Sequence, residues 1–334
     1  MIHAPSRRRL LAAFAASAFA VAPAGAQTQP TAEPLIAHHA AHGGRALTIL
    51  RNGIVRVESY AGPRTAPAPL GEASSALCTA LAAAMAADRM LELGEPAALT
   101  LSEFSTSPLK SGTLVRHLLA RTCGIPAAAA GSTAAALAAE PITPPGQVFD
   151  PTDAGLVLFA ELARRKLAAR GLEGDPAYYL QRRVLDPIGA VDVTFERGVE
   201  GLARLGDGAE ASGPALAAFG ELIRRGGIWR ARWLIDPETV SECAVTNGVS
   251  SRAGLGWWLG AGPPLSPDDP LRAVSDLWQF GPGLPTDLMM AAGHGGQRLY
   301  ILPTRRIVAA RLGDPVAGAS WSDAAFLRHL LATL

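Results

Sequence analysis

Three polar residues stand at the start of the most apolar stretch of the chain. Glu72, Ser74 and Ser75 precede a run from Ala76 to Met90 that consists mainly of Ala, Leu and Met and contains neither Gly nor Pro. Such a run predicts a helix that is apolar on nearly every face and is therefore buried in the middle of a domain. A serine at the N-terminus of that helix either caps it or acts as a nucleophile in a cleft, with the positive end of the helix dipole behind it.

The elements that would position these residues are distributed unevenly along the chain. Two apolar segments around Asn52-Gly53 predict a β-hairpin over residues 46–60. Further strands are expected at 229–235, 256–259, 298–302 and 307–312, and helices at 114–120, 154–170, 178–184, 215–225, 237–243 and 322–334. Because strands occur near both ends, we expect an α+β fold, an α/β sandwich in which both ends join one antiparallel sheet flanked by helices, with a mostly helical middle subdomain.

The N-terminal residues predict export. A twin-arginine-like segment at residues 6–11 precedes an apolar stretch from Leu10 to Ala22 and an Ala-x-Ala cleavage site that ends at Ala26. The stretch is too short for a stable transmembrane anchor, so we expect a signal peptide over 1–26 and a periplasmic or secreted mature protein; an uncleaved anchor is the alternative. Residues 27–44 are expected to form a loose linker, and 45–334 a single domain.

Composition limits the partners and cofactors. The 334-residue chain has a formal net charge of +1, which gives no reason to expect nucleic acid as a partner. The three cysteines, Cys78, Cys123 and Cys243, form no disulfide framework. His38, His39 and His42 lie in the linker with no carboxylate or cysteine nearby, so we expect no metal site. We predict no cofactor, and the oligomeric state is left open.

Several short motifs are spread over nearly the whole expected mature chain. They comprise residues 91–96 (Leu-Glu-Leu-Gly-Glu-Pro), 116–119 (Arg-His-Leu-Leu), 122–126 (Thr-Cys-Gly-Ile-Pro), 145–149 (Pro-Gly-Gln-Val-Phe), 226–229 (Gly-Gly-Ile-Trp), 256–258 (Gly-Trp-Trp), 292–297 (Ala-Gly-His-Gly-Gly-Gln) and 301–303 (Ile-Leu-Pro). Their order and spacing resemble the serine β-lactamase-like and penicillin-binding-protein-like hydrolases. The chain is most similar to the esterase and 6-aminohexanoate-oligomer hydrolase branch of that family.

The catalytic motifs of that family are degenerate in this chain. In the family's S-x-x-K motif the Ser attacks a carbonyl, and the Lys lowers the cost of ionising the hydroxyl. Counting back from residues 91–93 places the Ser on Glu72 and the Lys on Ser75. The Tyr of the family's Y-x-N motif falls on Pro151, and the Asn falls on Asp153.

The family's third motif, H-x-G on the inner strand, is matched by His294 and Gly296. A shifted alignment makes Ser75 the nucleophile and puts Cys78 at the Lys position, but a thiol needs a nearby cation to replace the amine. Ser107 and Lys110 also match S-x-x-K as a string. They lie in an expected loop, and we assign them no catalytic role.

The resemblance and the residues present define one candidate site. We predict Ser75, Asp153 and His294 as its catalytic group, with a carboxylate as base and His294 as acid or orienting group. The residues expected to line the cleft are Glu72, Ser74, Pro151, Gly295, Gly296, Gln297 and Trp257. The alternative is that Ser74 only caps the helix, because a serine without a base in hydrogen-bond reach is a poor nucleophile.

Two functions follow from these residues. The first is a β-lactamase-related protein that has lost acyl transfer and uses its cleft to bind a small-molecule or cell-wall-type ligand. The second is an active serine hydrolase of esterase or amidase type with a non-standard site around Ser75, Asp153 and His294. The absence of the Lys and Tyr from their motif positions favours the first.

Overall fold

The computed structural model describes residues 32–152, 154–260, 262, 264–279, 285–317 and 320–334. Its main sheet is antiparallel and has the strand order β2-β1-β11-β10-β9-β8. The strands are β1 (Gly44–Arg51), β2 (Ile54–Tyr60), β8 (Trp258–Leu259), β9 (Met289–Gly293), β10 (Gln297–Leu302) and β11 (Ile307–Gly313). The predicted α+β fold is confirmed, since the N-terminal hairpin pairs directly with the last strand.

The sheet is buried on both faces because its strands carry apolar side chains at successive positions. In β11, Ile307 and Ala309 belong to one core cluster, whereas Val308 and Ala310 belong to the other. Successive side chains of a strand point to opposite faces, so a continuous apolar run requires cover on both faces.

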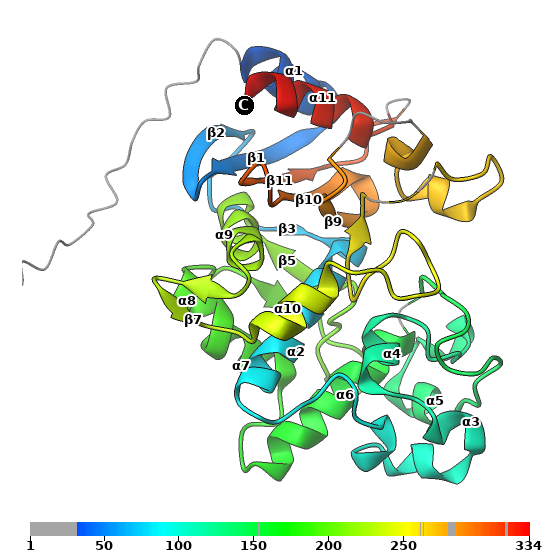
Figure 1. Ribbon diagram of the computed structural model, residues 1–334. Coiled ribbons are helices and arrows are strands. Elements are labelled where there is room, and N and C mark those ends of the chain that lie inside the picture. Colours follow the sequence, from blue (N-terminus) through cyan, green and yellow to red (C-terminus); the bar gives the residue numbers. More distant parts are fainter. Residues whose placement is uncertain (1–31, 153, 261, 263, 280–284, 318–319) are drawn as a thin grey trace, which may run out of the picture.

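Helices supply that cover on each face (Figure 1). On one face α1 (Glu33–Ala41) packs beside α11 (Asp323–Thr333). On the other face α9 (Gly213–Arg224) contacts β1, β10 and β11. Gly220 allows the close approach of α9, since a Cβ atom there would lie 2.6 Å from a methyl group of Val308.

The predicted apolar helix lies in the interior. A 3₁₀ turn, η2 (Gly71–Ser74), leads into α2 (Ser75–Ala87), in which 11 of 13 residues are buried. It packs against α10 (Pro237–Cys243) and α7 (Pro176–Leu180). Burial of nearly the whole helix surface follows from its lack of a polar stripe.

The remaining elements form the helical part of the molecule and two small sheets. The further α-helices are α3 (Pro108–Ser111), α4 (Val115–Leu119), α5 (Thr133–Ala138), α6 (Ala154–Ala169) and α8 (Asp186–Ile188), with a π-helical turn at Gln181–Leu185. Short 3₁₀ turns occur at Ala97–Leu99, Ser102–Thr106, Ala127–Ala129, Pro270–Ala273, Asp276–Gln279 and His294–Gly296. The small sheets comprise β3 (Ala68–Pro69), β4 (Thr194–Phe195) and β5 (Ala209–Ala211), and the pair β6 (Ile228–Trp229) and β7 (Arg232–Trp233).

The structure corrects one expectation about organisation. Residues 27–44 were expected to be a loose linker, but α1 occupies Glu33–Ala41 and its Leu35 is fully buried. The helix is stabilised by packing against α11 and β1 rather than by its own sequence. The expected signal peptide over 1–26 lies outside the described residues. None of the helices in the described ranges has the length and apolar character needed to cross a bilayer.

Candidate functional site

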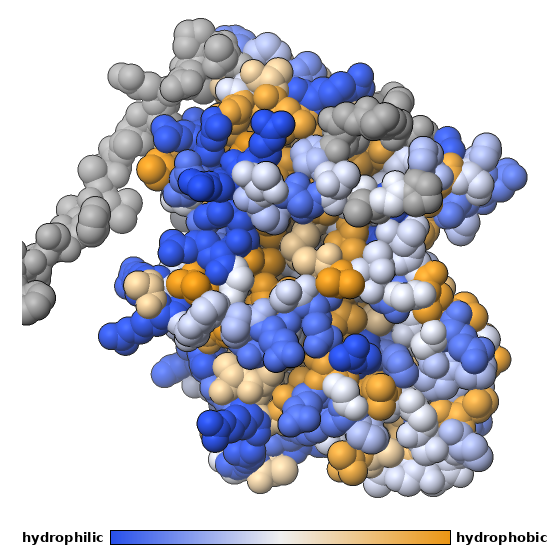
Figure 2. All heavy atoms as spheres, in the orientation of Figure 1, coloured by the Kyte–Doolittle hydropathy of each residue, from blue (hydrophilic) through white to orange (hydrophobic). Residues whose placement is uncertain are grey.

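Two cavities meet at Glu72 and Pro151, next to the start of α2. The first has a volume of about 690 Å³ and lies between the Ala-rich segment 127–133 and residues 197–207. The second has a volume of about 640 Å³ and is lined by Arg121, Trp258, residues 272–276 and the turn between β9 and β10. Figure 2 shows hydrophobic side chains gathered in the middle of one face of the molecule, with mainly hydrophilic side chains around them.

Glu72 occupies the position at which the family resemblance places the nucleophile. The backbone N–H of His294 donates a hydrogen bond to Oε2 of Glu72 at 2.9 Å. This contact requires β9 and η2 to approach closely, and a Cβ atom on Gly293 would lie only 2.0 Å from the carbonyl oxygen of Leu70. The backbone at the end of β9 therefore binds the Glu72 carboxylate, a side chain of this protein, where a ligand group could otherwise bind.

Ser75 is 3% exposed and has two partners. Its Oγ donates to the carbonyl oxygen of Gly256 at 3.3 Å and accepts from Nη2 of Arg121 at 3.1 Å. Nη1 of Arg121 also donates to the carbonyl oxygen of Pro151 at 2.9 Å. A guanidinium supplies only donors, so Arg121 cannot take a proton from the hydroxyl.

Ser74 is fully buried and does not cap α2. Its Oγ donates to the carbonyl oxygen of Gly71 at 2.6 Å and accepts from the backbone N–H of Ala209 at 3.0 Å. The expected helix-cap role was therefore wrong, because the residues before α2 already form a 3₁₀ turn instead of the extended backbone of a capping residue. Through these two hydrogen bonds Ser74 instead connects η2 to β5.

The His294–Gly296 motif lies in a 3₁₀ turn between β9 and β10, not on a strand as expected. Gly295 and Gly296 have φ angles of +72° and +77°, which favour glycine. Nη1 of Arg311 donates to the carbonyl oxygens of both glycines, at 2.9 and 2.7 Å, and fixes the turn. His294 lines the second cavity, whereas Asp153, the third residue of the predicted catalytic group, lies outside the described residues.

The structure places some of the expected cleft residues elsewhere. Glu72, Pro151, Gly295 and Gly296 line the cavities, but Ser74, Gln297 and Trp257 do not. The side chain of Gln297 is buried and exchanges hydrogen bonds with the backbone of Gly313.

The prediction that Trp257, rather than its neighbour Trp258, lines the cleft is also corrected. Trp257 is 2% exposed, stacks on Phe219 and donates to Oγ1 of Thr79. Trp258, on the opposite side of the chain, lines the second cavity, and its ring centroid lies 5.8 Å from the guanidinium carbon of Arg121. Adjacent residues in extended backbone face opposite ways, and the Trp-Trp pair itself does not show which ring faces the core.

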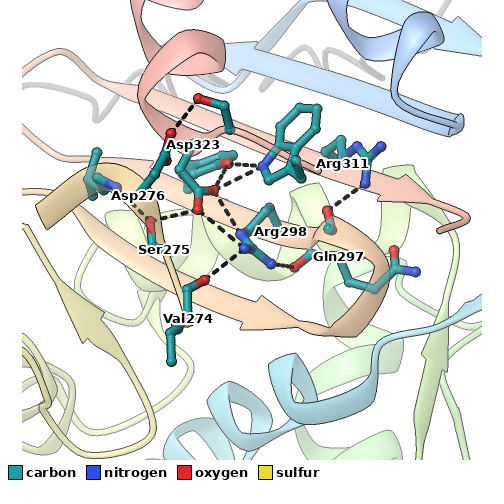
Figure 3. Close-up of polar contacts among 12 residues, drawn as sticks. Val274, Ser275, Asp276, Gln297, Arg298, Arg311 and Asp323 are labelled. Carbon is teal, nitrogen blue, oxygen red and sulfur yellow. Dashed lines mark hydrogen bonds and ion pairs between the residues drawn. The ribbon is translucent and has the colours of Figure 1, made fainter. Parts of the chain in front are cut away.

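A buried polar network lies beside the second cavity (Figure 3). Arg298 forms an ion pair with Asp323 at 2.8 Å and also donates to the carbonyl oxygens of Gly293 and Val274. Ser275 donates to Asp323 at 2.6 Å. Burial opposes ionisation of Asp323, but the charge and hydrogen bonds of Arg298 outweigh it and hold the pKa of this carboxyl below its usual value. These contacts hold Val274, Ser275 and Gly293 in position, and all three line the second cavity.

Sequence reasoning missed Arg121 and Arg272, which both line the second cavity. Arg121 lies 46 residues from Ser75, and its contact with Ser75 depends on a backbone φ angle of +56°. Neither this long-range contact nor the positive φ angle can be predicted from the residues next to Arg121 in the sequence. Within the described residues, no group of three or more His, Cys, Asp or Glu side chains is placed to hold a metal ion.

Comparisons with known proteins confirm the resemblance at the level of the fold. A protein from Bacteroides dorei provisionally named a β-lactamase is 17% identical over 90% of this chain and 98% of its own, with a TM-score of 0.72. A family VIII carboxylesterase is 15% identical over 91% of this chain and 97% of its own, with a TM-score of 0.67. A penicillin-binding protein homologue from Caulobacter crescentus is 16% identical over 92% of this chain and 98% of its own, with a TM-score of 0.64.

No family model and no curated protein matches the sequence. The fold is that of the β-lactamase-like hydrolases and penicillin-binding proteins. Within that class, the structural neighbours include a Bacillus anthracis protein provisionally named a 6-aminohexanoate-dimer hydrolase, 17% identical over 89% of this chain and 80% of its own, with a TM-score of 0.67. At these identities the similarity establishes the fold alone.

Proposed function

We propose that this chain is an exported protein of the β-lactamase fold that binds a small-molecule or cell-wall-type ligand in its cleft and does not perform acyl transfer. The observation that carries the proposal is the environment of Ser75. Its hydroxyl is buried between the carbonyl of Gly256 and the guanidinium of Arg121, so among the residues that the structure describes it has a donor and an acceptor but no base as a hydrogen-bond partner.

The lysines of the chain support the same conclusion. Lys110 and Lys166 are its only two lysines. Nζ of Lys110 binds the carbonyl oxygen of Leu137, and Nζ of Lys166 forms an ion pair with Glu95. Neither residue lines either of the two cavities. An amine that could share a proton with a serine is therefore not available at the start of α2.

Glu72 adds a second obstacle to acyl transfer. Its carboxylate accepts the backbone N–H of His294, a donor that a substrate carbonyl would otherwise be able to use. A negative charge at this place also disfavours the oxyanion that forms when a carbonyl is attacked. The cleft retains volume, a shaped wall and polar groups, which are the properties of a binding site.

The proposal is tested by measuring covalent labelling and ester turnover together. We expect the wild-type protein to form no adduct with a fluorophosphonate or a penicillin probe by intact mass, and to hydrolyse nitrophenyl esters no faster than its Ser75→Ala and Ser74→Ala variants. The triple variant Glu72→Ser, Ser75→Lys, Pro151→Tyr restores the family's residue types and serves as the matched comparison. An acyl adduct on a serine of the wild-type protein would establish the alternative, an active hydrolase around Ser75, Asp153 and His294.

The export part of the proposal rests on residues 1–26. We expect the chain expressed in a bacterium to be recovered from the periplasm or medium with Gln27 as its first residue. A full-length chain retained with the cytoplasm or the membrane would contradict this expectation, and N-terminal sequencing of each fraction distinguishes the outcomes.

A further inference from the structure

The two cavities that meet at Glu72 and Pro151 differ in chemistry, and this difference limits the ligand. We call them the apolar chamber, between segment 127–133 and residues 197–207, and the cationic chamber, beside Arg121 and Arg272. Because both include Glu72 and Pro151, one molecule can extend from one chamber into the other. Such a ligand must present a different chemical group in each chamber and a third at the junction.

The apolar chamber owes its width to small side chains. Its walls include Ala127, Ala130, Val157, Ala160, Leu202 and Leu205. Arg197, Glu200, Arg204 and Asp207 also line it, but their charges are engaged in ion pairs or in hydrogen bonds to the backbone. The Ala-rich segment that forms one side is held in place, since the Glu200 carboxylate accepts from the backbone N–H groups of Thr133 and Ala134 at 2.8 and 3.1 Å. A pre-formed chamber whose walls are mainly apolar suits an aliphatic chain, because burial of each methylene group is favourable.

The carboxylates in and beside the cationic chamber already have hydrogen-bond or ion-pair partners within the protein. The carboxylate of Asp276 accepts hydrogen bonds from the Ser322 hydroxyl and the backbone N–H of Ala324, and Asp323 pairs with Arg298. Arg272 donates only weakly, at 3.4 Å, to the carbonyl oxygens of Leu265 and Ser266, and it forms no ion pair within the described ranges. Its guanidinium can therefore receive a ligand carboxylate.

At the junction between the chambers the exposed carboxylate of Glu72 offers a hydrogen-bond acceptor to a ligand. Oε2 of Glu72 accepts the N–H of His294, whereas Oε1 has no hydrogen bond to any residue that the structure describes. A carboxylate oxygen beside a ligand repels an anion and favours an N–H group. A ligand that spans both chambers is therefore favoured when it carries an N–H group between its apolar part and its anionic part.

We propose that the cleft binds N-acyl amino acids, with the acyl chain in the apolar chamber, the amide N–H on Glu72 and the carboxylate on Arg272. This inference rests on the proposed binding function and assigns the Ala-rich segment 127–133 the role of chamber wall. Two cavities of about 690 and 640 Å³ provide room for a medium-length acyl chain and a small amino acid.

Calorimetric titration with N-decanoylglycine, kept below its micelle concentration, tests the assignment of each group. Three probes each lack one group: N-decanoylsarcosine has no amide N–H, N-decanoylglycinamide has no carboxylate, and N-acetylglycine has no long chain. We expect each to bind at least about tenfold more weakly than N-decanoylglycine, a loss of about 1.4 kcal/mol or more. Equal affinity for N-decanoylglycine and N-decanoylglycinamide, or no measurable binding of N-decanoylglycine, would overturn the proposal.

Variants test the same assignment from the side of the protein. Arg272→Gln should remove the preference for the carboxylate over the carboxamide, and Glu72→Gln should remove the preference for the amide N–H over the N-methyl group. Ala130→Phe should fill the apolar chamber and weaken N-decanoylglycine by at least about tenfold. Its control is Ala135→Phe, at an exposed position of α5 that does not line the chamber. If both preferences persist in the variants, the assignment is wrong.

Intact mass and product analysis of the same samples separate this inference from the proposed function. Selective binding with no adduct and no released decanoate supports both. Selective binding with cleavage supports the ligand class and refutes the absence of acyl transfer. No binding, with no adduct from the probes of the proposed function, refutes the ligand class alone.

Discussion

At the scale of single residues, Arg121 decides what Ser75 can do. The chain turns at Arg121 through a left-handed backbone conformation, with a φ angle of +56°, which costs about 1 kcal/mol for a residue with a side chain. The cost is offset by hydrogen bonds to the Pro151 carbonyl and the Ser75 hydroxyl. The Ser75 hydroxyl thereby joins α2 to the loop after α4, which is the structural role that the proposed function gives it.

The two serines at the start of α2 give a prediction about stability. Ser75→Ala removes a hydroxyl whose two hydrogen bonds are 3.3 and 3.1 Å long, and we expect the free energy of unfolding to fall by about 1 kcal/mol. Ser74→Ala leaves the buried N–H of Ala209 without its acceptor, so we expect a larger loss of about 1–3 kcal/mol. Urea denaturation of the wild-type protein and both variants measures the difference; a greater loss in Ser75→Ala would contradict it.

At the scale of secondary structure, the hairpin, the buried helix and most later elements follow from the sequence. Asn52 and Gly53 both have positive φ angles, as the predicted two-residue turn requires. The apolar run predicted α2 to within a few residues at each end. The helices predicted at 154–170 and 215–225 correspond to α6 and α9. These segments were predictable because their own pattern decides their structure.

Other elements depend on contacts between distant parts of the chain. Strand β9 has the sequence Met-Met-Ala-Ala-Gly, which contains no β-branched or aromatic residue, and it is held by its pairing with β10 and β8. Helix α1 forms because it packs on α11 and β1. The candidate site was predictable at Glu72, Pro151 and the Gly295–Gly296 turn, but not at Arg121 or Arg272, whose roles arise only after folding.

Lys110 anchors the Ala-rich segment and provides a test at this scale. It is 3% exposed, and its Nζ donates to the carbonyl oxygens of Leu137 and Ala138 and pairs with Glu140 at 3.2 Å. We expect Lys110→Met to release residues 127–140, seen as faster amide hydrogen exchange and proteolysis there. Lys166→Met, which removes an ion pair with Glu95 instead, is the control. Equal protection of 127–140 in both variants would show that Lys110 is no anchor.

At the scale of the whole molecule, α1 and α11 enclose a group of histidines. Burial and the nearby charges of His42, His329 and Arg311 lower the pKa of His38 to about 4, although Asp276 opposes the shift. Burial, Arg311 and His38 lower the pKa of His39 to about 3. The folded protein therefore requires both rings to be neutral.

The sign of the pH dependence follows from these lowered pKa values. In the unfolded chain both histidines bind protons near pH 6.5, whereas in the folded protein they bind them only near pH 4 and 3. Their contribution to stability is complete above pH 6.5 and is lost as the pH falls below it, by up to about 1.4 kcal/mol per pH unit for each histidine.

Replacement of the more deeply buried histidine tests this expectation. His39→Leu removes one titrating group, so the free energy of unfolding should vary less steeply between about pH 6.5 and pH 4.5 than in the wild-type protein. Urea denaturation at a series of pH values measures both slopes. Identical slopes would show that His39 is already protonated in the folded protein or does not titrate on unfolding.

Arg311 links the N-terminal helix to the cleft. One nitrogen of its guanidinium binds the carbonyls of Gly295 and Gly296, and the other binds the carbonyl of His42, just after α1. A shortened chain that starts at residue 45, where the sequence alone suggests that the domain begins, would lack that carbonyl and the whole of α1. A protein engineer who trims the chain at that boundary would therefore loosen the Gly295–Gly296 wall of the second cavity, and should begin at Gln27 instead.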